Sequence, residues 1–153
     1  IAHAGGAIDG HTYTNSLEAL NLNYARGYRL FELDIIKTAD NIYVAAHDWQ
    51  GWKNETGFTG KLPPTRDTFK QYKVRGRFTP LDLADINNWF IQHSDAILVT
   101  DKVNEPALFV PQFIDKSRLM MELFSSSAVK DALALEIKSA MPNWSIVRRM
   151  TFM

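Results

Sequence analysis

Four side chains in the first third of the sequence could together hold a metal ion and move protons. Glu32 and Asp34 stand two positions apart in an apolar segment, and His3 and His47 each lie within or after a short apolar run. Two carboxylates buried on one strand cannot both stay ionised and unpaired, because burying bare charge is costly, whereas Mg²⁺ or Ca²⁺ neutralises both. Two histidines that titrate near neutral pH supply a general base and a general acid. The set therefore predicts metal-assisted displacement at phosphorus.

Each of these residues also has a structural interpretation. Glu32 and Asp34 could face solvent from an edge strand or pair with arginine, and a single histidine is more often structural than catalytic. Lys102 follows a later apolar run, where it could place a positive charge on a phosphate or simply be a solvated lysine. The combination of two histidines with an acid pair favours the chemical interpretation.

The elements that must position these residues follow from hydrophobic spacing and turn residues. Alternation in residues 28–36 predicts a strand with Glu32 and Asp34 on the same face. Further strands are expected at 1–4, 42–47, 96–100 and 118–124, and helices at 16–26, from Thr79-Pro80 onward, and at 126–140. Asn15 and Glu18 resemble a capping box for the first helix, and Thr79 resembles the cap of the second.

Three segments carry weaker signals. Residues 49–73 are rich in Gly, Thr, Lys and Pro without a sustained period, which indicates a long functional loop rather than a linker between domains. Residues 105–113 contain two prolines, so at most a short helix fits there. Ile146-Val147 could begin one more strand.

Strands that alternate with helices predict an α/β fold with a mostly parallel sheet. We expect a (β/α)8 TIM-type barrel, in which functional groups lie at the carboxyl ends of the strands. Such a barrel takes about 250 residues, so a chain of 153 residues is expected to hold only the amino-terminal four or five β/α units, as one partial domain spanning residues 1–153. The chain begins at Ile1 without a methionine, and we expect residues before it to be missing.

Composition excludes several other classes of function. Lysine and arginine number 17, as do aspartate and glutamate, so no bulk charge draws the chain to nucleic acid or to an anionic membrane. There is no cysteine, which removes disulfides and thiolate chemistry, and no apolar run approaches the roughly 20 residues that span a bilayer. The expected partner is a small molecule. Compartment and oligomeric state stay open.

Several motifs resemble those of the glycerophosphodiester phosphodiesterase family. They are Ala2-His3-Ala4-Gly5-Gly6, Asn15-Ser16-Leu17-Glu18-Ala19-Leu20, Gly27, Phe31-Glu32-Leu33-Asp34, Val44 to Asp48, Thr79-Pro80-Leu81 and Val99 to Lys102. Order and spacing agree over the first third of the chain and thinly to about residue 102. The resemblance implies hydrolysis of a glycerophosphodiester to an alcohol and glycerol 3-phosphate, with Ca²⁺ or Mg²⁺ as cofactor. It implies that a glycerol hydroxyl attacks phosphorus to form a cyclic phosphate, which water then opens.

The same resemblance assigns roles to residues. His3 and His47 match the catalytic pair, Glu32 and Asp34 match metal ligands, and Lys102 matches a phosphate contact. Spider-toxin-type phospholipase D enzymes are similar in the two histidines and the Glu-x-Asp pair, so a phospholipid headgroup is a second class of substrate. Trp49 and Trp52 could pack on such a substrate or anchor their loop.

The chain also departs from the family pattern. Ala4 stands where the family usually has arginine, Thr14 stands where it has glutamate, and Thr100 stands where it has a further acidic ligand. Alternation is expected to send Asp101 to the opposite face, so Glu122 is our candidate for another metal ligand; it could equally pair with a buried lysine or arginine. These departures leave an alternative, a catalytically silent barrel that binds a phosphorylated ligand or partner.

Overall fold

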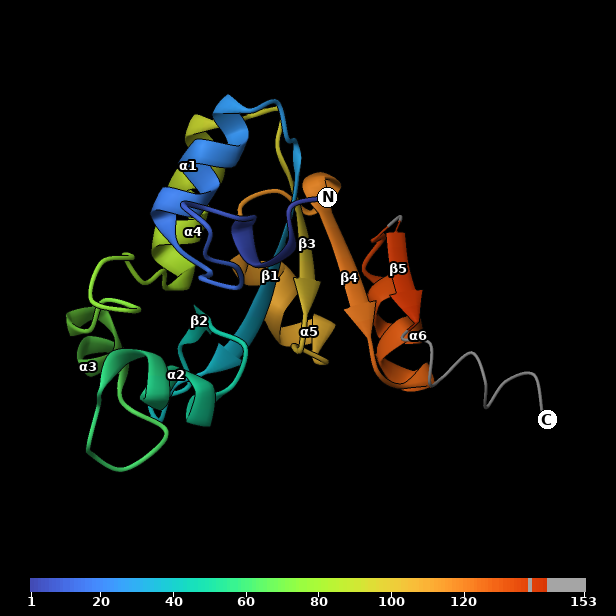
Figure 1. Ribbon diagram of the computed structural model, residues 1–153. Coiled ribbons are helices and arrows are strands. Elements are labelled where there is room, and N and C mark those ends of the chain that lie inside the picture. The colour runs from blue at the N-terminus through green and yellow to red at the C-terminus, as the bar shows by residue number, and fades with distance from the viewer. Residues whose placement is uncertain (138, 143–153) are drawn as a thin grey trace, which may run out of the picture.

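The computed structural model describes residues 1–137 and 139–142, which form a parallel sheet flanked by helices (Figure 1). The strands are β1 (Leu30–Lys37), β2 (Tyr43–Ala45), β3 (Ile97–Asp101), β4 (Leu119–Leu123) and β5 (Ser139–Pro142), in the spatial order β2-β1-β3-β4-β5. β1, β3, β4 and β5 run parallel, and β2 pairs antiparallel with the end of β1. Ala2 adds a parallel bridge to Phe31 on the side of β1 that faces away from β3. Parallel strands joined by helices confirm the α/β expectation and match part of a TIM-type barrel.

The helices cover one face of this sheet and extend beyond the end of β2. They are α1 (Leu17–Ala25), α2 (Trp49–Thr56), α3 (Arg66–Gln71), α4 (Leu83–Gln92), α5 (Pro106–Phe109) and α6 (Ser126–Ala134). Short 3₁₀ turns occupy His3–Gly5, Val110–Gln112 and Lys116–Arg118. Among the described residues, every helix is too short or too polar to span a bilayer.

Alternation along β1 separates the core from the candidate site. Phe31, Leu33 and Ile35 are fully buried in the main hydrophobic cluster, which also takes in α4. The ring of Phe31 lies 5.0 Å from that of Trp89 on α4, measured between centroids. Glu32 and Asp34 therefore point to the other face of the strand, which is the face that lines the inside of a barrel.

The strand predictions are confirmed with ends that differ by at most two residues, for the segments at 28–36, 42–47, 96–100 and 118–124. The strand expected at 1–4 is reduced to the single bridge at Ala2, because His3–Gly5 turns at once into a 3₁₀ helix. Ala4 adopts a φ of 49° inside that turn. The short helix expected within 105–113 is present as α5.

Two helix starts were predicted at the wrong residue. Ser16, not Asn15, caps α1, since its hydroxyl accepts a hydrogen bond from the Ala19 N–H. Asp82, not Thr79, caps α4 and forms a capping box with Asp85. In both places a second good capping residue follows a few positions later and takes the role.

The segment 49–73 was wrongly expected to be an irregular loop. It contains α2 and α3, each capped at its start by a side chain, Asp48 or Thr65. Trp52 and Phe69 from these two helices stack with centroids 5.6 Å apart, and they bury against Val44 and Ala46. This small second core, which we call the insertion core, holds α2 over the end of β2.

The helix expected at 126–140 was too long. It ends at Ala134, followed by Glu136 with a φ of 65°, and residues 139–142 form β5 instead. Left-handed backbone at Glu136 interrupts the helical hydrogen bonds, which frees the chain to return to the sheet. The strand expected at Ile146-Val147 lies outside the described residues.

Candidate active site

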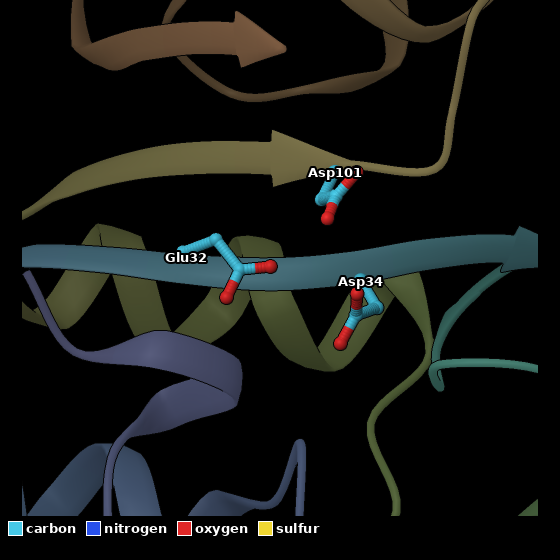
Figure 2. Close-up of side chains that lie close together, drawn as sticks. All are labelled: Glu32, Asp34 and Asp101. Atoms are coloured by element: carbon cyan, nitrogen blue, oxygen red, sulfur yellow. The ribbon is translucent and has the colours of Figure 1, made fainter. Parts of the chain in front are cut away.

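Three carboxylates meet at the carboxyl ends of two neighbouring strands. Glu32 and Asp34 lie on β1 and Asp101 ends β3, and each offers an oxygen within 4.8 Å of the other two. Figure 2 shows all three projecting from adjoining strands toward one another. The parallel register pairs Asp34 with Asp101, and directly paired residues project to the same face of a sheet. We call these three residues the carboxylate cluster.

Asp101 therefore corrects the expectation that its side chain lies on the opposite face. Thr100, rather than Asp101, is the residue that faces the helices, and it is fully buried. Thr100 and Asp101 do lie on opposite faces of β3, as alternation predicts, but it is Asp101 that shares the face of Glu32 and Asp34. Glu122 lies on β4, one strand farther along the sheet, and is not a member of the cluster.

Backbone and amide groups hold the cluster in place. The Ala4 N–H donates to Glu32 Oε2 at 2.7 Å, from the turn that follows Ala2. Asn15 makes a reciprocal pair with Asp34: its amide donates to Asp34 Oδ2 at 3.1 Å, and its Oδ1 accepts from the Asp34 N–H at 3.2 Å. Asn15 has a φ of 47°, a left-handed conformation that asparagine tolerates better than most residues. The residue expected to cap α1 thus orients a carboxylate instead.

The electrostatics of the cluster favour a bound cation. Burial raises the pKa of Glu32 to about 7, and the charges of Asp34 and Asp101 add to this, while the Ala4 N–H and His3 act in the opposite direction. Glu32 and Asp34 are 7% and 3% exposed. Closely spaced, buried carboxylate oxygens are the ligands that Ca²⁺ and Mg²⁺ take, so the donor set fits such an ion.

The two histidines flank the cluster from different elements. His3 Nδ1 lies 3.6 Å from Glu32 Oε2. His47 follows β2, and the neighbouring Ala46 N–H donates to the Asp34 carbonyl oxygen at 3.0 Å, which ties the end of β2 to the cluster. Both imidazoles are more than half exposed. They are therefore accessible to a substrate that approaches the strand ends.

Asp48 orients the imidazole of His47. Its Oδ2 lies 2.7 Å from His47 Nδ1, and its Oδ1 accepts from the Gly51 N–H at 2.5 Å at the start of α2. The hydrogen bond with His47 lowers the pKa of Asp48, the Gly51 N–H lowers it further, and the charge of Lys102 contributes less. An ionised Asp48 only accepts hydrogen bonds, so Nδ1 of His47 carries a proton and Nε2 is left for proton transfer.

Lys102 and the residues that depart from the family pattern occupy distinct places. Lys102 is exposed just past β3, with a φ of 72°, and its N–H donates to Asp101 Oδ1 at 2.6 Å. Thr14 is buried, and its hydroxyl pairs with that of Ser16 at 2.9 Å. Thr14 thus supplies no carboxylate, and Asp101 brings the cluster to three.

Trp49 and Trp52, the two tryptophans of α2, have structural roles. Trp52 is 4% exposed and packs against Phe58, Phe69 and Tyr72. The rings of Trp49 and Trp52 are nearly perpendicular, with centroids 5.5 Å apart, and the indole N–H of Trp49 donates to the Lys37 carbonyl oxygen. These contacts support the interpretation that both residues anchor the segment.

Sequence reasoning missed three residues of the site: Asn15, Asp48 and Asp101. Asp48 could have been suspected from its place directly after His47. Asn15 and Asp101 carry no local signal for their roles, because these depend on a contact 19 positions away and on strand register.

Comparison with known proteins identifies solved structures that share this fold. No family model matches the sequence, and no curated protein sequence matches it significantly. A glycerophosphoryl diester phosphodiesterase from Parabacteroides distasonis is similar in structure, with a TM-score of 0.70, 19% identity, and coverage of 93% of this chain and 52% of that one. A glycerophosphodiester phosphodiesterase from Agrobacterium tumefaciens gives a TM-score of 0.63 at 18% identity, covering 79% of this chain and 56% of that one.

A phosphodiesterase from Oleispira antarctica, solved in complex with the product sn-glycerol-3-phosphate, gives a TM-score of 0.64 at 20% identity, with coverage of 88% and 60%. The chain thus spans between half and three fifths of the length of these proteins. It has the fold of the glycerophosphodiester phosphodiesterase barrels over that part of their length.

Proposed function

We propose that the chain carries the metal-binding and proton-transfer part of a phosphodiesterase that hydrolyses glycerophosphodiesters or related phospholipid headgroups. The observation that carries the proposal is the carboxylate cluster beside His3 and the end of β2. The shared fold supports it, as does the product bound in the Oleispira antarctica protein. Residues 1–153 would form one partial barrel domain, since one main hydrophobic cluster joins α1, α4, α5 and α6 to the sheet.

A divalent cation would be held by Glu32, Asp34 and Asp101. When bound, it supplies positive charge that binds the phosphate and offsets the charge that develops on its oxygens. Lys102, exposed at the end of β3, would add a second positive charge beside the phosphate. Ca²⁺ and Mg²⁺ both accept oxygen ligands of this kind, and the number of water ligands would distinguish them.

The histidines would divide the proton transfers between them. His3 would take the proton from the attacking hydroxyl, which in the proposed route is a hydroxyl of the substrate's own glycerol. His47 would give a proton to the departing alcohol through Nε2, with Asp48 holding Nδ1. In the second stage the roles reverse: His47 removes a proton from water, which opens the cyclic phosphate, and His3 returns its proton to the glycerol oxygen. After the two stages each histidine has returned to its initial protonation state.

One feature favours a second candidate, a catalytically silent barrel that binds a phosphorylated ligand. Ala4 stands in the turn beside Glu32 and offers only its backbone N–H, which Glu32 already accepts. Apart from the imidazole of His3, this turn therefore offers no side chain that could bind a phosphate. The carboxylate cluster is complete without it, which is why we prefer the enzyme.

Release of glycerol 3-phosphate from glycerophosphodiesters, with and without EDTA, tests the proposal. We expect turnover that EDTA abolishes and that added Ca²⁺ or Mg²⁺ restores. His47→Gln should lower kcat by about 100-fold or more, since a general acid typically contributes that much. Binding of Ca²⁺ and of glycerol 3-phosphate without turnover would instead support the silent barrel.

A further inference from the structure

A cavity of about 420 Å³ opens beside His47, between α2 and the loop that precedes α1. Asn15, which holds Asp34, lines it near the carboxylate cluster, and Glu55 and Arg75 line it farther along α2 and the segment after α3. The volume lies within the range of small-molecule binding sites. It adjoins the strand ends and extends away from them toward the insertion core.

The position of His47 indicates which part of a substrate this cavity would receive. His47 lines the cavity, while His3 lines a separate hollow near the amino terminus, within the part of the chain that the structure describes. A general acid must lie within hydrogen-bond reach of the oxygen that it protonates. The alcohol that leaves with a proton from His47 is therefore the portion of the diester that fits here.

The charged groups of the cavity wall are already paired with one another. Arg75 Nε lies 2.6 Å from Glu55 Oε2, and its Nη2 lies 3.1 Å from Oε1, a bidentate pair. Asp48 is paired with His47 and with the start of α2. A cationic alcohol entering the cavity would thus meet no uncompensated carboxylate among these residues, and would meet the guanidinium of Arg75.

The aromatic groups of the wall do not form a cage for a cation. Sites for quaternary ammonium groups present open aromatic faces around the charge. Trp52 is 4% exposed, and its ring packs against Phe58 and Phe69. Tyr13, the other aromatic residue found in the wall among the described residues, is 60% exposed, so most of its ring faces solvent. A single open ring does not enclose an ammonium group.

We infer that this cavity binds the alcohol portion of the substrate and selects an uncharged polyol, such as glycerol, over a cationic alcohol such as choline. The inference rests on the proposed function and adds the class of alcohol. The ion pair of Glu55 and Arg75 determines this selectivity, because the two charges cancel and leave a polar wall without a net negative charge.

Two diesters with the same glycerol 3-phosphate half test the inference: glycerophosphoglycerol and glycerophosphocholine. For each form of the protein, kcat/KM is measured for both diesters in one preparation. The ratio of the two values then does not depend on how much of the protein is folded. We expect the wild type to prefer glycerophosphoglycerol. Arg75→Gln frees the Glu55 carboxylate and should shift the ratio toward the choline diester by roughly threefold to tenfold, as expected for one partly screened charge several ångströms away.

Glu55→Gln should shift the ratio in the opposite direction, because it leaves the Arg75 charge uncompensated. Lys53→Gln, on α2 but outside the cavity wall, is the matched control and should leave the ratio unchanged. Wild-type preference for the choline diester, or equal ratios in all four proteins, would overturn the inference while the proposed function stands. Absence of turnover of both diesters by the wild type would overturn the proposed function and the inference with it.

Discussion

At the scale of single residues, the carboxylate cluster depends on one register pair. Asp34 and Asp101 lie directly opposite each other on β1 and β3, and Glu32 lies two positions earlier on β1. A divalent cation would be attracted to all three at once, so each of the three carboxylates is expected to contribute to the affinity for the cation.

Asp34→Asn should weaken Ca²⁺ binding by at least about tenfold, since it removes one of three negative charges at the ion. Asparagine keeps the size of the side chain, so the fold should be retained, as a thermal melt would show. Calorimetric titration with Ca²⁺ measures the change, and Asp131→Asn on the exposed side of α6 is the control. Equal affinity in Asp34→Asn and wild type would remove Asp34 from the site.

Asp101 and Glu122 give a second test at this scale, because they lie on adjacent strands and were assigned differently by sequence and by structure. Asp101→Asn should weaken Ca²⁺ binding by a factor similar to that of Asp34→Asn, and Glu122→Gln should not, because Glu122 lies outside the cluster. The reverse result in the same titration would restore Glu122 as the third ligand.

At the scale of elements, an ion pair holds the segment between β2 and α4, which contains α2 and α3, against the start of α4. The side chain of Asp82 is 2% exposed, caps α4, and lies 2.7 Å from Arg66 Nε on α3. Burial alone would raise the pKa of Asp82, but hydrogen bonds from the Asp85 N–H and from Arg66 outweigh it and lower the pKa. A lowered pKa stabilises the folded state above the unfolded pKa of about 3.9, and this stabilisation is lost as pH falls through the folded value.

Asp82→Asn should therefore lower the free energy of unfolding by about 1–2 kcal/mol at pH 7, because asparagine still caps a helix but carries no charge for Arg66. The difference from wild type should shrink at pH 3. Urea unfolding at the two pH values measures it. A difference that is the same at both values would show that the charge of Asp82 does not contribute.

The sequence predicted some of these helices and strands but not others, for physical reasons. β1 and β3 were found because burial and alternation are properties of a few adjacent residues. α2 and α3 were missed because each is short and is stabilised by the contact between Trp52 and Phe69, which the local pattern does not contain. Asp101 was misplaced for the same kind of reason, since strand register is a property of two segments. His3, His47, Glu32 and Asp34 were found from residue type and spacing, and their roles stay predictions.

At the scale of the whole molecule, the sheet formed by the described residues is open. Ala2 lies at one side of β1 and β5 ends the described sheet on the other side, and Leu30 and Phe124 are each more than a third exposed. Strands of a closed barrel have neighbours on both sides, while open edges and apolar side chains invite pairing with other chains.

These 153 residues on their own should therefore associate as concentration rises. Sedimentation velocity over a range of concentrations would show it as growth of species larger than 17.4 kDa. Exposed apolar side chains add to this tendency, so Leu30→Lys, which replaces one of them with a charged side chain, should reduce association. A monomer that persists at high concentration would count against an open barrel.

A crystal structure of the chain with Ca²⁺ is the most direct test of the central claim, that the carboxylate cluster is a metal site. We expect one ion within about 2.3–2.6 Å of oxygens from Glu32, Asp34 and Asp101, with water or phosphate completing its coordination. An ion bound elsewhere, with these three carboxylates making no contact to it, would contradict the claim.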